Sequence, residues 1–183
     1  MAYESALNKA WEDLDRFDPA KIIPVKFLAD EYTIDLDARR VISLACNAPA
    51  KDFTAILLLH YLACKLKGLP AVTQEWLSFK ELSGVEGYLP AFRKRAIEPI
   101  IRKYGRNPES LLDDLERLSA KRTNQADVSI VLEALEGVPA LVNLWRADDE
   151  FGPEANMLFD RSISQIFSTE DIVVLAGFIA SLL

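Results

Sequence analysis

The sequence has few of the residue types on which common cofactor sites depend. It contains one histidine, two cysteines and seven glycines among 183 residues. Two cysteines are too few for a self-contained thiolate cage around zinc or an iron–sulfur cluster. The glycines show neither the Walker spacing nor the dinucleotide-binding spacing. These scarcities exclude conventional nucleotide-binding loops and leave any cofactor unidentified. So few cysteines also suit a reducing compartment, so we expect a cytoplasmic protein.

Long hydrophobic runs and an excess of positive charge are missing as well. The longest apolar run, residues 172–183, is shorter than the roughly 20 residues that span a bilayer, and residues 1–17 lack the pattern of a signal peptide. Acidic residues outnumber basic ones by 28 to 21, for a formal charge of −7. Because nucleic-acid binding needs a dominant basic face, we expect neither a membrane nor a nucleic acid as a partner.

The composition that remains is that of an ordinary globular protein, with 50% hydrophobic and 27% charged residues. A chain of this length can bury roughly 70% of the surface that it exposes when unfolded. The one clear polar connector, residues 121–127, is too short to separate two domains. We therefore expect a single domain over residues 1–183.

Hydrophobic periodicity predicts an α+β fold. Helical spacing indicates helices over residues 3–17, 53–67, 90–104, 107–118 and 168–183, with a kink at Pro99 in the third. Alternation of apolar and polar residues indicates strands near 25–45 and 128–146, the latter as a hairpin. We expect a small, mainly antiparallel sheet packed against about five helices, with the helix over 53–67 at the centre.

His60, the only histidine, precedes Cys64 by one helical turn on an apolar face. The pair suggests either a two-ligand metal corner or a Cys/His catalytic pair. The alternative is a hydrogen-bonded core histidine beside a core cysteine, since free cysteine is among the most buried residue types. Because the surrounding sequence supplies no further obvious ligands, the core interpretation is favoured.

The helix that begins at Pro90 is strongly basic, with six basic side chains and one acidic side chain over residues 93–106. Periodicity places Arg93 on the same side as Ile97 and Ile100, whereas Arg95 and Glu98 point away. A guanidinium on the core side needs a carboxylate, a phosphate or an anionic ligand, because an unpaired buried charge is costly. Arg93 is therefore predicted to meet either a structural partner or a ligand.

An acidic segment follows the strand that ends at Trp145. It contains Asp148 and Glu150, with Asp160 a few residues further on. Carboxylates on a loop at a strand end can bind a divalent cation or serve as an acid/base pair, although their spacing matches no calcium loop. The alternative is a solvated acidic turn that pairs with the basic helix.

Several stretches of the sequence resemble a known family. They are residues 57–62 (LLLHYL), 75–82 (EWLSFKEL), 88–99 (YLPAFRKRAIEP) and 144–151 (LWRADDEF), with similar residues at 153–154, 158–160 and 169–171. The chain thereby resembles the domain-of-unknown-function family 3786 of bacteria and archaea, over most of its length. The resemblance implies membership of a family whose function is unknown and which is common in anaerobes. Some members are labelled iron–sulfur proteins because they carry cysteine-rich segments, which this chain lacks.

The family pattern draws attention to polar and aromatic residues, several of which periodicity also singles out. They are Trp76, Ser78, Arg93, Arg95, Glu98, Trp145, Asp148, Glu150 and Asp160. We hypothesise a non-catalytic binding or accessory module that recognises an anionic small molecule, a cofactor or a partner enzyme. Arg93 and Arg95 would hold the anion in a cleft walled by Trp76 and Trp145, with Ser78 and Glu98 nearby.

Two other functions remain open at this point. A metal-dependent enzyme would use Asp148, Glu150 and Asp160, with His60 and Cys64 as weaker candidate ligands. A structural protein would instead form a homodimer through its apolar C-terminal helix, residues 172–183.

Overall fold

The computed structural model describes residues 2–17 and 19–183. Within these ranges, the α-helices are α1 (Ala2–Leu14), α2 (Asp52–Lys67), α3 (Leu89–Phe92), α4 (Glu98–Tyr104), α5 (Ile163–Ile166) and α6 (Thr169–Leu182). A π turn, η3 (Arg93–Ile97), joins α3 to α4, and short 3-10 segments are η1 (Phe79–Glu81), η2 (Glu86–Tyr88) and η4 (Pro108–Asp114). These helices, together with the strands described next, confirm the predicted α+β class.

The strands fall into two antiparallel sheets, whereas the sequence analysis placed them in one. The smaller sheet has the order β1-β2-β3-β4, formed by β1 (Ile22–Phe27), β2 (Asp30–Asp35), β3 (Arg40–Ser43) and β4 (Ala48–Pro49). The larger has the order β5-β9-β8-β7-β6, formed by β5 (Trp76–Ser78), β6 (Lys121–Thr123), β7 (Val128–Leu135), β8 (Val138–Trp145) and β9 (Glu154–Asp160). The Leu28 N–H donates to the Ala134 carbonyl at 2.8 Å and links the two sheets.

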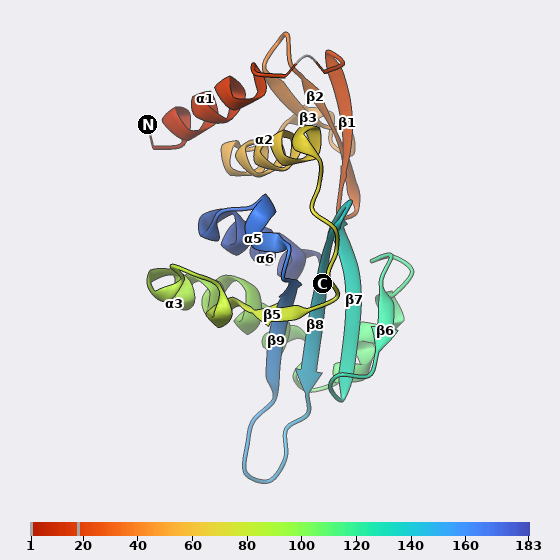
Figure 1. Cartoon of the computed structure of the whole chain (residues 1–183). Helices are drawn as coiled ribbons and strands as arrows, with labels where there is room; N and C mark the ends of the chain where they lie inside the picture. Colours follow the sequence, from red (N-terminus) through yellow and green to blue (C-terminus); the bar gives the residue numbers. More distant parts are fainter. Residues whose placement is uncertain (1, 18) are drawn as a thin grey trace.

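The longer helices gather on one side of the strands, as Figure 1 shows. Helix α2 packs against α1, α5 and α6, and its Leu57, Leu58 and Leu59 are completely buried. It is therefore central, as its apolar surface all round predicts. Among the described residues, none of the helices combines the length and apolarity needed to cross a membrane.

Helices α2 and α6 run antiparallel along a shared seam. At one end the rings of Phe53 and Phe178 lie 5.7 Å apart, and at the other His60 Nδ1 lies 2.9 Å from Asp171 Oδ2. Each helix advances seven residues, or two turns, between these contacts, in opposite chain directions. The two helices are thus held together at both ends of this seam.

Strand β9 is the main element that the sequence analysis missed, because its acidic surroundings were read as a loop. Apolar residues recur at every second position, at Ala155, Met157 and Phe159, and this spacing is the available signal, although Leu158 between them is also apolar. Met157 and Phe159 are fully buried, and they face Val142 and Ala140 of β8. The strand therefore completes the core face of the larger sheet.

The kink expected at Pro99 takes the form of the π turn η3. The Glu98 N–H donates to the Arg93 carbonyl, five residues back instead of four. Pro99 has no N–H, and its ring would clash with the Arg95 carbonyl of a regular helix. The wider turn shifts the helical phase, so Arg93 points outward with 69% of its side chain exposed. Its predicted placement on the core side is wrong.

Candidate functional site

The two tryptophans proposed as walls of one cleft lie far apart. Trp76 faces Asp160 across β5 and β9, whereas Trp145 faces Glu154 at the other end of β9. Six residue steps along a strand span about 20 Å. The predicted cleft between Trp76 and Trp145 is therefore not formed.

The other polar residues of that cleft have local partners. The Ser78 N–H donates to Glu81 Oε2 at 2.7 Å as part of the capping box of η1, and Ser78 Oγ donates to the same oxygen at 2.7 Å. Arg93 Nε lies 3.8 Å from Glu98 Oε1, and both side chains are exposed. These contacts stabilise local turns. They give Ser78, Arg93 and Glu98 partners within the chain, so none of the three needs a ligand.

The carboxylates of the metal-enzyme alternative do not converge. Asp148 accepts hydrogen bonds from the backbone N–H groups of Glu150 and Phe151, at 2.9 and 2.7 Å, and shapes the exposed connection between β8 and β9. Asp160 lies at the far end of β9. Within residues 2–17 and 19–183, no three His, Cys, Asp or Glu side chains are placed to hold one metal ion.

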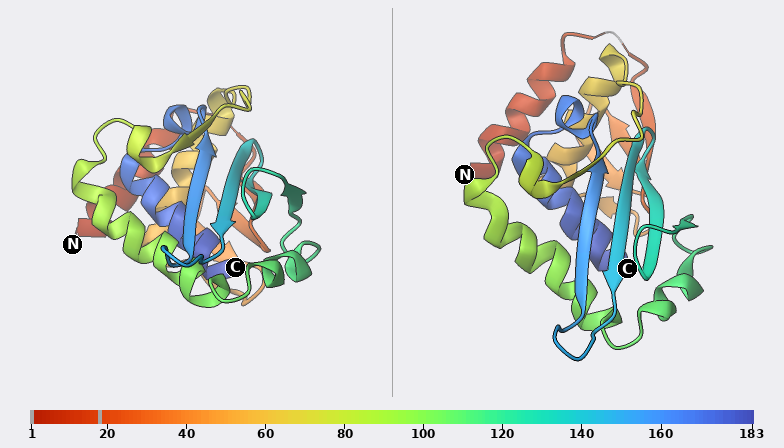
Figure 2. Two further views of the ribbon diagram at one scale, coloured as in Figure 1. Left: turned by 90° about the horizontal axis from the view of Figure 1, so that it is seen from below. Right: turned by 60° about the horizontal axis from the view of Figure 1, so that its bottom comes forward.

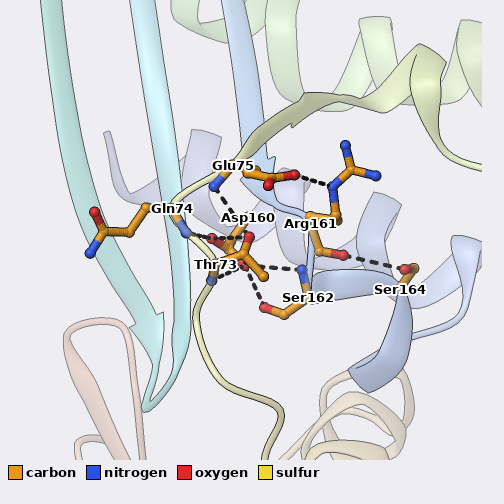
Figure 3. Close-up of polar contacts among 7 residues, drawn as sticks. All are labelled: Thr73, Gln74, Glu75, Asp160, Arg161, Ser162 and Ser164. Carbon is orange, nitrogen blue, oxygen red and sulfur yellow. Dashed lines mark hydrogen bonds and ion pairs between the residues drawn. The ribbon is translucent and has the colours of Figure 1, made fainter.

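Asp160 is a buried structural carboxylate, with 1% of its surface exposed. Its Oδ1 accepts hydrogen bonds from the N–H and hydroxyl of Ser162, at 3.0 and 2.7 Å, and from the Thr73 N–H at 3.1 Å. Its Oδ2 accepts from the Gln74 N–H at 2.7 Å, and the Thr73 hydroxyl lies 3.1 Å from both oxygens. Figure 3 shows these donors surrounding the carboxylate. N–H and O–H donors thus occupy the positions that a cation would need.

These hydrogen bonds determine the protonation of Asp160. Burial by itself raises the pKa of the carboxyl, but the bonds from Ser162 and Thr73 outweigh it and hold the pKa below its ordinary value. Beside it, Arg161 Nε lies 2.5 Å from Glu75 Oε2, and the Arg161 N–H donates to the Glu75 carbonyl at 2.8 Å. The charged carboxylate thereby fixes the segment that leads into β5 against the end of β9.

His60 is hydrogen-bonded, as the favoured interpretation predicts, but 35% of its side chain is exposed, so it is not a core residue. Its Nδ1 contacts Asp171 Oδ2, to which Ser168 Oγ also donates at 2.7 Å. Ser168 contacts the carboxylate and not the imidazole, so these three residues lack the order of a nucleophilic triad. Cys64 Sγ lies 3.8 Å from the Gln165 carbonyl, so neither residue of the predicted pair engages the other.

The contact with Asp171 sets the charge of His60. Its hydrogen bond raises the pKa of the imidazole, burial lowers it, and the more distant charges of Asp13 and Lys9 on α1 raise and lower it respectively. The net result is a pKa above the ordinary value of 6.5. The protonated imidazolium is therefore favoured in the folded state.

One predicted residue, Arg95, lines an apolar groove along α6, which we call the α6 groove. Its volume is about 460 Å³, and its lining consists of Tyr3, Phe53, Arg95, Val173, Val174, Gly177, Phe178 and Ser181. Helix α6 supplies the floor, α1 and α2 supply Tyr3 and Phe53, and η3 supplies Arg95. In the right panel of Figure 2, α6 lies between α1 and the helix formed by α3, η3 and α4.

The α6 groove combines aromatic surface with one unpaired cation. Tyr3 is 57% exposed, and Phe178 packs on Phe53. The Arg95 guanidinium forms no ion pair with any residue in the described ranges, and none of the lining residues is acidic. A Cβ built on Gly177 would lie 3.8 Å from the Arg95 Cβ. Because glycine has no side chain, the space beside Arg95 above this part of α6 is left open.

Of the residues that line the α6 groove, only Arg95 is a candidate site residue from the sequence. Phe53 belongs to the helix over 53–67, whose apolar surface predicts a core position, and the last helix is a dimer surface in only one of the three functions that the sequence leaves open. In the structure Ile172, Leu175 and Ile179 are buried in the core, so only a strip of α6 is open. A partly exposed apolar strip was not distinguishable from core by composition alone.

Replacing Asp160 by asparagine tests its structural role. The Asp160→Asn variant places an amide NH₂ among N–H and O–H donors and removes the charge, so we expect a loss of about 2–4 kcal/mol in the free energy of unfolding. The Asp148→Asn variant, in an exposed turn, is the matched control and should lose less than about 1 kcal/mol. Urea unfolding measures both, and equal losses would contradict the role assigned to Asp160.

The His60–Asp171 contact predicts a pH dependence. Because the folded pKa of His60 lies above 6.5, its contribution to stability is fully present below pH 6.5 and is lost as the pH rises through the folded pKa. His60→Gln should remove the loss of stability that accompanies a rise in pH above 6.5 in the urea-unfolding profile. As His60 is the only histidine, its Cε1 proton gives the folded pKa directly by NMR, and a value at or below 6.5 would refute the assignment.

Comparison with known proteins agrees with the resemblance seen in the sequence. No curated protein and no solved structure matches the chain significantly. The family described as a domain of unknown function, DUF3786, matches residues 14–181. The matched range includes the seam between α2 and α6, the Asp160 site and every residue that lines the α6 groove except Tyr3. Most of α1 lies outside the matched range. The chain belongs to the DUF3786 family.

Proposed function

We propose that this chain is a non-catalytic, cytoplasmic binding module that takes an anionic small molecule with an apolar body into the α6 groove. The observation that carries the proposal is the Arg95 guanidinium, which is unpaired among the described residues and borders an apolar groove without acidic side chains. Free thiols at Cys46 and Cys64 suit the reducing compartment.

The charge of Arg95 favours a carboxylate or a phosphate as the ligand's polar group. A guanidinium offers a planar fork of N–H donors that matches either group in a bidentate arrangement. Because no acidic residue of the lining competes for it, the guanidinium is available to a ligand. Of the residues predicted to form the cleft, the proposal retains Arg95 and does not require Arg93, Trp76 or Trp145.

The lining favours an apolar body beside the anion. Val173, Val174 and Phe178 form the floor with Gly177, and Tyr3 and Phe53 add aromatic surface. The volume of about 460 Å³ falls within the roughly 300–1,000 Å³ of small-molecule sites. Burial of apolar ligand surface here supplies affinity, and Arg95 supplies orientation and selectivity for negative charge.

Octyl phosphate and octanol form a suitable probe pair, because they share the apolar chain and differ in the anion. Titration calorimetry should show binding of octyl phosphate to the wild-type chain and weaker binding of octanol. The Arg95→Gln variant should weaken octyl phosphate binding by about tenfold or more. Arg93→Gln is the matched control, because it removes a neighbouring arginine that does not line the groove.

A second variant tests the open space of the α6 groove independently of the charge of Arg95. Gly177→Leu places a large side chain on the floor, while a leucine within a helix is more favourable than a glycine. We expect the melting temperature to hold or rise and binding of both probes to be lost. Binding of octyl phosphate to Arg95→Gln with unchanged affinity, or its failure to bind the wild-type chain, would refute the proposal.

A further inference from the structure

The free edge of β1 differs from the other three sheet edges. The edge strands of the two sheets are β1, β4, β5 and β6. Strand β4 has two residues and β5 and β6 have three each, whereas β1 has six. Short edges offer little to a pairing chain. Among the four described edge strands, β1 is therefore the only one long enough to pair with another chain over more than three residues.

The pairing of β1 with β2 shows which backbone groups face that edge. The Leu36 N–H donates to the Lys21 carbonyl at 2.9 Å, and Ile22 is paired with Asp35. Since hydrogen-bonded pairs alternate in an antiparallel ladder, odd-numbered residues of β1 bond to β2 and even-numbered ones face outward. Leu28 agrees, because its N–H donates outward to Ala134.

Pro24 and Lys26 occupy outward-facing positions. Pro24 has no N–H and leaves only its carbonyl at the edge. The N–H and the carbonyl of Lys26 are both directed outward, and no hydrogen bond within the described residues uses this N–H. The edge thus presents groups that recur every two residues, about 6.7 Å apart. A second extended chain reproduces that spacing, whereas a small molecule does not.

A cavity of about 470 Å³ lies along this edge. Pro24, Val25 and Lys26 form one side, and Leu118 and Ser119 form another. The space beside the unpaired backbone groups is thus bounded by protein rather than open on all sides. We call it the β1 slot.

We propose that the β1 slot binds an extended segment of a partner protein, which adds to the smaller sheet as a strand beside β1. Main-chain hydrogen bonds to Lys26 and Pro24 provide the pairing, as in β-augmentation. The partner residue opposite Pro24 only donates, because Pro24 has no N–H to give. This site is separate from the α6 groove and does not rest on the function proposed for it.

The charges of the β1 slot indicate the partner's composition. Lys26, Lys65, Glu31, Glu133 and Glu136 line the cavity. Lys65 is paired with Glu136, which leaves Lys26 with the two carboxylates of Glu31 and Glu133. The remaining charge is negative, so the segment should carry a lysine or an arginine.

A random decapeptide library displayed on phage, selected against the full chain, provides the probe. Selection should enrich peptides that carry a basic residue, and these should bind the Arg95→Gln variant as they bind the wild type. Lys26→Pro removes the outward donor without removing a bond to β2, and should weaken binding by about tenfold. Lys26→Ala is the matched control, because it keeps the N–H, and should bind like the wild type.

Amide exchange provides an independent readout that does not require the proline variant to fold. In the free chain the Lys26 amide should exchange rapidly, while those of Val25 and Phe27, bonded to β2, are protected. Addition of an enriched peptide should protect the Lys26 amide. The absence of any enrichment, a Lys26 amide already protected in the free chain, or no gain of protection with peptide would each overturn the proposal.

Discussion

The buried charge of Asp160 is the constraint on which the arrangement of the other elements depends. A carboxylate that is 1% exposed is tolerated only when donors surround it, and Thr73, Gln74 and Ser162 supply them. Two of these residues belong to the segment between α2 and β5, and the third begins the path from β9 to α5. One carboxylate thereby fixes the segment that enters β5 from α2 and the segment that leaves β9 for α5.

The seam between α2 and α6 depends on the segment after β9, which Asp160 holds in place through Ser162. Helix α6 begins at Thr169, seven residues after Ser162 in the chain, and Asp171 in its first turn meets His60 of α2. Ser168 and Asp171 form the capping box that begins the helix. The Asp171 carboxylate therefore both caps α6 and attaches it to His60 of α2. The opposite end of the seam, at Phe53 and Phe178, is part of the α6 groove.

Elements were predictable from the sequence where one periodicity extended over a long stretch. The helix over 53–67, the hairpin between β7 and β8 and the last helix lie close to their predicted ranges. Strand β9 was missed because Glu154 and Asp160 at its ends resemble loop residues. The division into two sheets depends on distant pairings, such as that of Trp76 with Asp160, which local patterns do not contain. The Asp160 site was recognisable as a carboxylate but not as a buried one.

The misplacement of Arg93 and the position of Arg95 have the same cause. Pro99 supplies no N–H and would clash with the Arg95 carbonyl in a regular helix, and the π turn over 93–97 relieves both conflicts. The extra residue in that turn carries Arg93 outward, away from the apolar stripe, and leaves Arg95 beside Gly177 of α6. π turns are frequent at functional sites because they reposition side chains without ending the helix. Here a single proline accounts for the arginine that borders the α6 groove.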